Sequence, residues 1–228
     1  MHQKFNSMKN LIALSGKIGS GKDEVFRMMN GISGGKYENK KFAYKLKLIT
    51  SILIGCNVDQ LENREFKEAY LPPHWNVYYR VFTEDPGMKM GSIYASQEEL
   101  EDFYENFPIE LDDSMNTCEK LTARRILQLL GTEGCREVIH PNVWVNALFA
   151  DYQPESNWII TDCRFPNEAD AVKERGGVVI RIERHGRKQG GHASETALDN
   201  YTGFDHVIHN DGSLGDLYDK VHDLWKSL

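Results

Sequence analysis

Residues 10–23 have the sequence NLIALSGKIGSGKD, in which a short apolar run leads into a glycine-rich turn that ends at a lysine. The run Asn10–Ser15 has the pattern of a strand buried on both faces. Residues Gly16–Lys22 fit GxxxxGK, in which glycines let backbone amides close around an anion while the lysine reaches the β and γ phosphates. This stretch therefore predicts a phosphate-binding loop at the end of a buried strand.

A helix is expected directly after the loop, over Lys22–Asn30. Val25, Phe26 and Met29 recur at helical spacing, and the acidic residues Asp23 and Glu24 favour a first helical turn. Asp23 stands where the usual motif has a Ser or Thr that contacts Mg²⁺, so the motif departs from its pattern at the last position. The alternative is a glycine-rich turn between strand and helix that binds no ligand.

The rest of the chain alternates between helical and strand patterns. Helices are expected over residues 43–54, 121–130, 143–152, 167–175 and 214–228, and strands over residues 157–161, 177–183 and 206–208. This alternation predicts a three-layer α/β fold, with a mostly parallel sheet, helices on both faces and ligands at the carboxyl ends of the strands. Residues 72–116 are aromatic and acidic and contain several prolines, so we interpret them as an insertion into a single domain of residues 1–228.

Composition narrows the class of protein. A chain of 228 residues with 40% hydrophobic content can bury one substantial core. The sequence has no run of about 18 apolar residues and its first ten residues are polar, so we expect a cytoplasmic protein without a membrane span. The four cysteines form no CxxC pair, which favours reduced thiols. A net charge of −7 argues against nucleic-acid binding but not against a small phosphorylated substrate.

Asp162 and Arg164 lie at the end of the strand predicted over 157–161. This position brings a carboxylate and a guanidinium to the sheet edge that carries the loop. A strand-end Asp can hold Mg²⁺ through water while an arginine binds a phosphate. The alternative is an Asp–Arg pair that closes a turn.

Arg124, Arg125 and Arg136 flank a predicted kink at Gly131–Gly134 that follows a helix. Arginines around such a kink would suit an acceptor monophosphate, although exposed arginines on helices are also common. Trp144 can stack on a base or, more commonly for tryptophan, pack in the core.

A second basic cluster comprises Arg181, Arg184, Arg187 and Lys188. A basic segment that folds over the phosphates would neutralise charge and exclude water during phosphoryl transfer. The alternative is a charged surface loop.

Taken together, these segments resemble the deoxynucleoside monophosphate kinases of tailed bacteriophages. The resemblance rests on residues 14–16 and 20–23, 42–43 and 46–47, 64–68, 127–133, 142–144, 161–168 and 192–195. Asp23 after the loop lysine matches a feature of that family, whereas Glu24 stands where the family often has a hydroxyl residue. The resemblance implies a P-loop nucleoside monophosphate kinase fold, with an acceptor-binding inserted region over about 56–140 and a lid over about 184–196.

The resemblance also implies the ligands ATP, Mg²⁺ and a deoxynucleoside monophosphate, and it assigns candidate roles. Catalytic roles fall to Lys22, Asp162, Arg164 and Arg184, and Mg²⁺ coordination to Asp23 and Asp162. ATP binding falls to Gly16, Lys17, Gly19, Ser20, Gly21, Lys22, Asp23 and Arg187. Acceptor binding falls to Lys47, Arg64, Lys67, Arg124, Gln128, Thr132, Glu133, Arg136 and Trp144. Two alternatives stay open: a P-loop kinase of the phosphomevalonate or dephospho-coenzyme A type, and a non-catalytic nucleotide-binding protein. A homodimer is a possible assembly.

Overall fold

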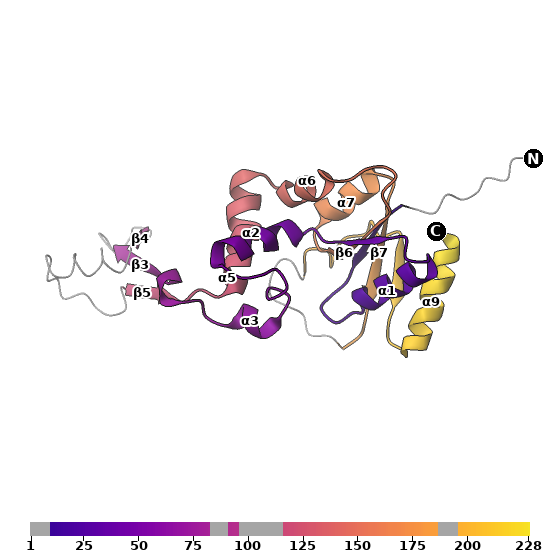
Figure 1. The fold of residues 1–228 in the computed structure, drawn as a ribbon, viewed down its shortest axis with the longest axis horizontal. Coiled ribbons are helices and arrows are strands. Elements are labelled where there is room, and N and C mark those ends of the chain that lie inside the picture. The colour runs from indigo at the N-terminus through magenta and orange to yellow at the C-terminus, as the bar shows by residue number, and fades with distance from the viewer. Residues whose placement is uncertain (1–9, 83–90, 96–115, 187–195) are drawn as a thin grey trace, which may run out of the picture. The chain divides into compact units, whose positions relative to one another are not determined.

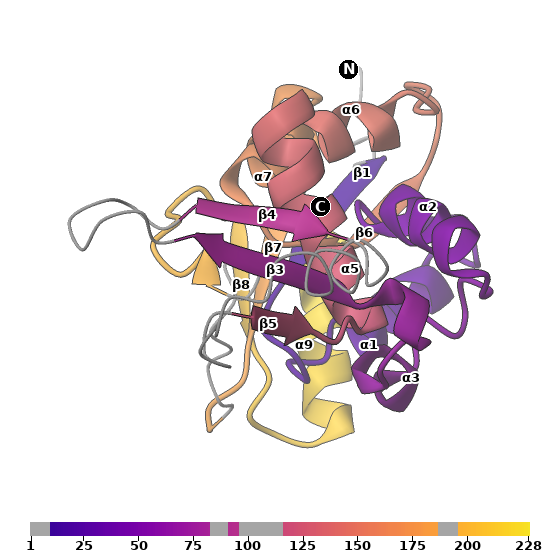
Figure 2. The same ribbon diagram turned by 90° about the vertical axis from the view of Figure 1, so that its left-hand side faces the viewer.

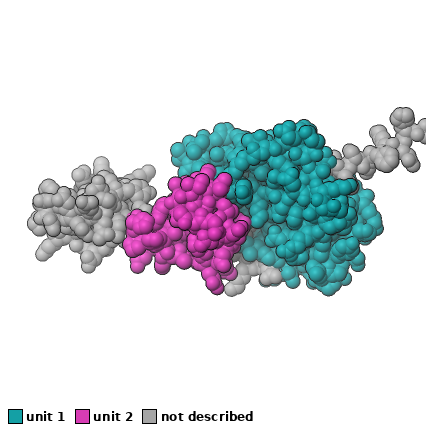
Figure 3. All heavy atoms as spheres, in the orientation of Figure 1, with its two compact units in different colours: residues 1–46, 134–228 teal, residues 47–133 magenta. Residues whose placement is uncertain are grey.

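A computed structural model describes residues 10–82, 91–95, 116–186 and 196–228 of the chain, with side chains described outside residues 77–119. The chain divides into two compact units (Figure 3). The core unit comprises residues 1–46 and 134–228, and the second unit comprises residues 47–133. The predicted boundaries of the inserted region, about 56–140, remain a prediction.

The core unit is built on a five-stranded sheet. Its strands are β1 (Leu11–Ser15), β2 (Glu38–Lys40), β6 (Trp158–Cys163), β7 (Val178–Glu183) and β8 (His206–His209), in the order β2-β6-β1-β7-β8. All four pairings are parallel. The central strands β6, β1 and β7 are mostly apolar, and all of their residues except Glu183 are buried, as expected for a parallel sheet covered by helices. The prediction of a parallel α/β fold is confirmed.

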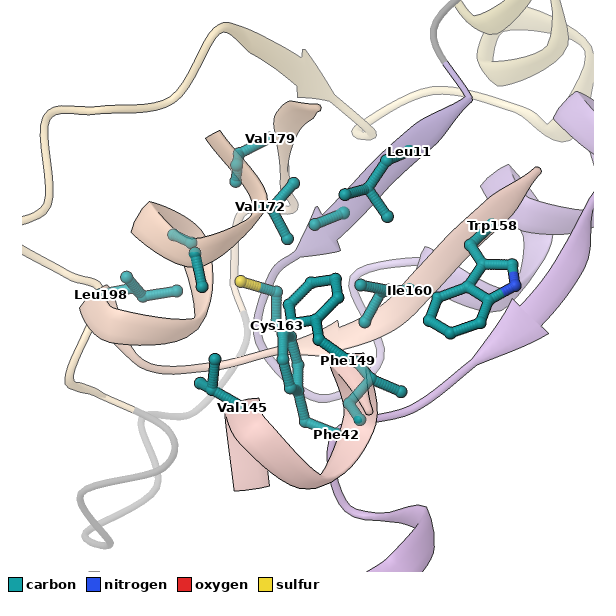
Figure 4. Packing of buried hydrophobic residues seen from close by; sticks show 14 residues of the cluster. Leu11, Phe42, Val145, Phe149, Trp158, Ile160, Cys163, Val172, Val179 and Leu198 are labelled. Atoms are coloured by element: carbon teal, nitrogen blue, oxygen red, sulfur yellow. The ribbon is translucent and has the colours of Figure 1, made fainter. Parts of the chain in front are cut away.

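Helices cover both faces of this sheet (Figure 1). Helices α1 (Lys22–Ile32) and α9 (Leu214–Ser227) pack on one face, where Ile12 and Leu14 of β1 point. Helices α6 (Val143–Phe149) and α7 (Pro166–Glu174) pack on the other face, with Leu11 and Ala13. Figure 4 shows this second core, in which Phe149 lies among side chains from the sheet and from the chain before α2. Along β1 and at the start of β6 and of β7, successive side chains alternate between the two cores, with the period of two expected for β structure.

The second unit contains short helices and a small antiparallel sheet. Helix α2 (Tyr44–Ile54) leads from the core unit into it, followed by α3 (Arg64–Glu68), the 3₁₀ turn η1 (Pro73–Trp75) and α5 (Ala123–Gln128). Strands β3 (Val77–Phe82), β4 (Gly91–Ala95) and β5 (Asn116–Glu119) pair in the order β4-β3-β5 (Figure 2). The insertion predicted over 72–116 therefore contains a β-sheet, which the sequence analysis did not foresee.

One local prediction was wrong. The chain does not kink at Gly131–Gly134 but continues from α5 as a π-helix, η3 (Leu129–Ile139), so both glycines lie inside a helix. The hydrogen bond from the His140 N–H to the Cys135 carbonyl, at 3.0 Å, has the five-residue spacing of such a helix. Across the described residues, no helix combines the length and apolarity needed to cross a membrane.

Candidate functional site

The phosphate loop joins the carboxyl end of β1 to the amino end of α1, the context that its motif requires. The Lys22 ammonium lies 2.5 Å from the Gly16 carbonyl oxygen and 2.9 Å from that of Lys17. The Ser20 N–H closes a turn by donating to the Lys17 carbonyl at 3.1 Å. Helix α1 starts after Gly21 without a side-chain cap. A glycine-rich turn, a lysine held over it and an uncapped helix start make a site suited to a phosphate chain.

Two loop glycines are required by their surroundings. A Cβ atom on Gly16 would lie 2.5 Å from both the Ile182 carbonyl oxygen and the Ser20 hydroxyl oxygen. Gly21 has φ of +103°, and a Cβ there would lie 2.5 Å from the side-chain nitrogen of Asn210. Any other residue would strain the backbone or displace a neighbour. The loop is thus packed against β7 and against the residue that follows β8.

Asp162 positions the chain that enters α2. Its Oδ1 accepts a hydrogen bond from the Phe42 N–H at 2.7 Å, and its Oδ2 accepts one from the Ala43 N–H at 3.0 Å. Nothing in the local sequence indicates this role. Each carboxylate oxygen has a second lone pair, so these bonds are compatible with the predicted contact to metal-bound water. Asp23, the other candidate metal ligand, is exposed in the first turn of α1.

Arg181 belongs to the sheet and not to the basic surface segment with which the sequence analysis grouped it. It lies on β7 with 8% of its surface exposed, and its guanidinium donates to the Ser15 hydroxyl at 3.1 Å. It also pairs with Asp199 at 3.3 Å, and the other Asp199 oxygen is 3.2 Å from the Lys17 ammonium. Asp199 therefore bridges a loop lysine and a buried arginine. No local sequence signal marked Asp199, because its partners are distant in the chain.

The predicted lid is described only at its ends. Arg184 is exposed directly after β7, whereas Arg187 and residues 188–195 lie outside the described residues. The proposed lid over about 184–196 therefore remains a prediction.

Arg136 lies in the core unit and pairs with a buried carboxylate. Its guanidinium is 2.7 Å from Glu168, which is 2% exposed, and it stacks 4.1 Å from the Phe165 ring centroid. Glu168 also accepts hydrogen bonds from the N–H groups of Arg164, at 2.8 Å, and Phe165, at 3.2 Å. Burial, followed by the nearby Asp162 carboxylate, raises the pKa of Glu168 to about 7. Glu168 is not among the predicted site residues, although it belongs to the segment 161–168 that carries the resemblance.

The other acceptor candidates divide between the units. Trp144 lies in α6 of the core unit and is 4% exposed, which favours core packing over stacking on a base. The remaining candidates belong to the second unit: Lys47 in α2, Arg64 and Lys67 in α3, Arg124 and Gln128 in α5, and Thr132 and Glu133 in η3.

Several of these second-unit side chains form ion pairs. Lys47 pairs with Glu62 at 2.7 Å and Arg124 pairs with Glu68 at 2.7 Å. Glu133 accepts from Arg125 at 2.8 Å. Lys47 and Arg124 are thus balanced by neighbouring carboxylates, and a bound phosphate would have to compete with these partners.

The family model and the related proteins that match this chain are all described as deoxynucleotide or deoxynucleoside monophosphate kinases. A family model described as deoxynucleotide monophosphate kinase matches residues 77–221, a range that begins after the phosphate loop. A putative deoxynucleotide monophosphate kinase of Acanthamoeba polyphaga mimivirus is 30% identical over 143 residues, which cover 57% of this chain and 68% of the viral protein.

Two phage proteins extend the comparison. The deoxynucleotide monophosphate kinase of Enterobacteria phage T4 is 33% identical over 126 residues, and this alignment spans 52% of each chain. The deoxynucleoside-5'-monophosphate kinase of Escherichia phage T5 is 27% identical over 191 residues, or 73% of each chain. Because the family model matches more than half of its residues, this chain belongs to the deoxynucleotide monophosphate kinase family and is a kinase enzyme.

Proposed function

We propose that this enzyme transfers the γ-phosphoryl group of ATP to the phosphate of a deoxynucleoside 5'-monophosphate, giving ADP and a deoxynucleoside diphosphate for DNA precursor synthesis. The observation that carries the proposal is the Lys22 ammonium, seated 2.5 Å from the Gly16 carbonyl oxygen at the carboxyl end of β1. The loop geometry supports binding of a nucleotide phosphate, and membership of the deoxynucleotide monophosphate kinase family supports a monophosphate as the acceptor. We also propose that the enzyme acts in the cytoplasm.

In this proposal the chain positions its ligands and neutralises charge. The amides of Gly16–Gly21 and the Lys22 ammonium hold the phosphates of ATP, with Lys17 and Arg187 as further contacts. Arg164 and Arg184 neutralise charge on the transferred group. No residue needs to act as a base, because the acceptor phosphate is already an oxyanion at neutral pH. Holding the two phosphates in line therefore supplies most of the catalysis.

The carboxylates of this site fit Mg²⁺. Magnesium in phosphoryl-transfer enzymes is bound through one or two carboxylates together with substrate phosphates, and it keeps several waters. Asp23 in the first turn of α1 and Asp162 at the end of β6 offer such oxygens. When bound, Mg²⁺ would offset the negative charge of the phosphates.

The proposed acceptor contacts include Arg136 of the core unit. Glu168 and Phe165 fix the guanidinium of Arg136, and a bound phosphate would have to compete with the Glu168 carboxylate for it. We expect Arg136→Ala to raise the acceptor KM or lower kcat while ATP binding changes little. Equal weakening of ATP and acceptor binding would remove Arg136 from the acceptor site.

The test is a coupled ADP-release assay with ATP and Mg²⁺ against dAMP, dGMP, dCMP, dTMP, modified dCMP and their ribose forms. Turnover selective for deoxynucleotides is expected, and the Lys22→Ala variant should stay folded but lose turnover. Turnover only with phosphomevalonate or dephospho-coenzyme A would change the acceptor class. Silence with every acceptor, combined with retained ATP binding, would support a non-catalytic nucleotide-binding protein.

A further inference from the structure

Asn210 connects the last strand of the core sheet to the phosphate loop. It follows β8 and is 8% exposed, and its side-chain NH₂ donates a buried hydrogen bond to the Ser20 carbonyl at 2.8 Å. Its own backbone N–H donates to the Glu183 carbonyl at 2.7 Å, which continues the pairing of β7 with β8. Because the sheet fixes the backbone of Asn210, the position from which its side chain reaches the loop is also fixed.

The loop is shaped to receive this side chain. A Cβ atom on Gly21 would lie 2.5 Å from the Asn210 side-chain nitrogen, and the Leu217 side chain of α9 would be 3.9 Å away. The amide of Asn210 thus occupies the space that a side chain at position 21 would need. Gly21 and Asn210 are complementary in shape, although they lie 189 positions apart in the sequence (210 − 21 = 189).

The hydrogen bond to Ser20 has a consequence for the next peptide group. A trans peptide unit is planar, so the carbonyl of Ser20 and the N–H of Gly21 point in opposite directions. When Asn210 holds the carbonyl on its own side, the Gly21 N–H is directed to the other side of the loop. Without this bond the peptide could rotate more readily, since glycine accepts both signs of φ.

We propose that Asn210 is a positioning residue that orients the Ser20–Gly21 peptide so that the Gly21 N–H is ready to bind a phosphate of the nucleotide donor. The inference rests on the proposed function, because it assumes that the loop binds phosphate. Asn210 lies outside GxxxxGK, and its part in the site is visible only in the fold.

Two replacements test this role. Asn210→Ala removes the donor. Asn210→Asp keeps the shape but places an acceptor opposite the Ser20 carbonyl. The matched control is Asn30→Ala, because the Asn30 side chain also bonds a backbone group, accepting from the Tyr37 N–H at 3.0 Å, but does so near the far end of α1.

The measurements are the affinities for ATP and inorganic tripolyphosphate, the KM values for ATP and acceptor, and urea unfolding. Asn210→Ala should weaken ATP and tripolyphosphate binding about tenfold, equivalent to about 1.4 kcal/mol. The acceptor KM should change little. Asn210→Asp should lower the affinities for ATP and tripolyphosphate further, since its carboxylate also repels phosphate. Asn30→Ala should lower stability without changing either affinity.

Unchanged tripolyphosphate affinity in a folded Asn210 variant would overturn the inference, as would an equal loss of affinity in Asn30→Ala. The Lys22→Ala variant separates this failure from failure of the proposed function. If Lys22→Ala loses tripolyphosphate binding while both Asn210 variants keep it, only the role of Asn210 is wrong. If the wild-type protein binds neither ATP nor tripolyphosphate, the proposed function fails and the inference fails with it.

Discussion

Replacing Glu168 with glutamine is expected to change how the stability of the fold depends on pH. Burial is the main cause that raises the pKa of this carboxyl group from 4.5 to about 7, and the Asp162 carboxylate adds to it. The Arg136 guanidinium and the N–H of Arg164 act in the opposite direction. The folded protein therefore binds a proton at Glu168 more tightly than the unfolded chain does.

The sign and size of the effect follow from this difference. Between pH 4.5 and 7 the unfolded chain releases the proton while the folded protein keeps it, so the free energy of unfolding falls as pH rises. At about 1.4 kcal/mol per pKa unit, the whole contribution is on the order of 3 kcal/mol. Above pH 7 both states are ionised and the contribution becomes constant.

The assay is urea unfolding from about pH 5 to 8 for the wild-type protein and Glu168→Gln, with the stability difference plotted against pH. We expect the wild-type protein to lose roughly 2–3 kcal/mol relative to the variant across this range. Asp205→Asn is the control. Burial raises the pKa of Asp205, but the Val179 N–H and Lys173 lower it more, to below 3.8. Its difference curve should be flat, because Asp205 is ionised in both states throughout. A flat curve for Glu168→Gln would mean that the hydrogen-bond donors of Glu168 outweigh its burial and that its pKa is not raised in the folded protein.

Gly16→Ala should destabilise the fold by about 1–3 kcal/mol in urea unfolding and weaken ATP binding, because its Cβ would lie 2.5 Å from two oxygen atoms. Gly31→Ala in α1 is its control and should be neutral or stabilising, since a Cβ there meets nothing within 4 Å; similar losses in both variants would contradict the steric argument. Asp162→Asn should cost about 1–3 kcal/mol in ligand-free protein, because it places an amide donor against a backbone N–H; unchanged ligand-free stability would show that the two hydrogen bonds contribute little. Asp199→Ala should lower the midpoint of thermal unfolding by removing the carboxylate from the buried Arg181, and an unchanged midpoint would limit that pair to a minor role.

The part of the site that the sequence predicted is the part whose signals are local. The apolar run before Gly16 requires burial on both faces, and the spacing of Gly16, Gly21 and Lys22 defines the phosphate loop. The later buried strands are short apolar runs and the helices have apolar residues at helical spacing, which is why the layered α/β architecture of the core unit was predictable. The polar strand β2 carries no such signal and was not predicted. The end of β6 likewise placed Asp162 at the sheet edge, although its hydrogen-bond partners were not foreseen.

The rest depends on contacts between distant residues. Asp199 bridges Lys17 and Arg181, and Asn210 reaches Ser20, across separations that no local pattern encodes. The π-helix was not predicted because Gly131 and Gly134 suggested the end of a helix. In the structure both glycines lie inside η3, where the chain continues with π-helical hydrogen bonding. The β3–β5 sheet was missed because antiparallel pairing in a short, aromatic insertion depends on register that composition does not reveal.

These distant contacts show how the sheet determines the shape of the loop. The Ile182 carbonyl of β7 leaves no room for a side chain at Gly16, and Asn210 after β8 leaves none at Gly21. Arg181 also bonds Ser15, the last residue of β1. The loop is therefore held from neighbouring strands as well as by its own glycines. It follows that a GxxxxGK match supplies flexible backbone and a lysine, while the strands around it supply the conformation in which that backbone can bind phosphate.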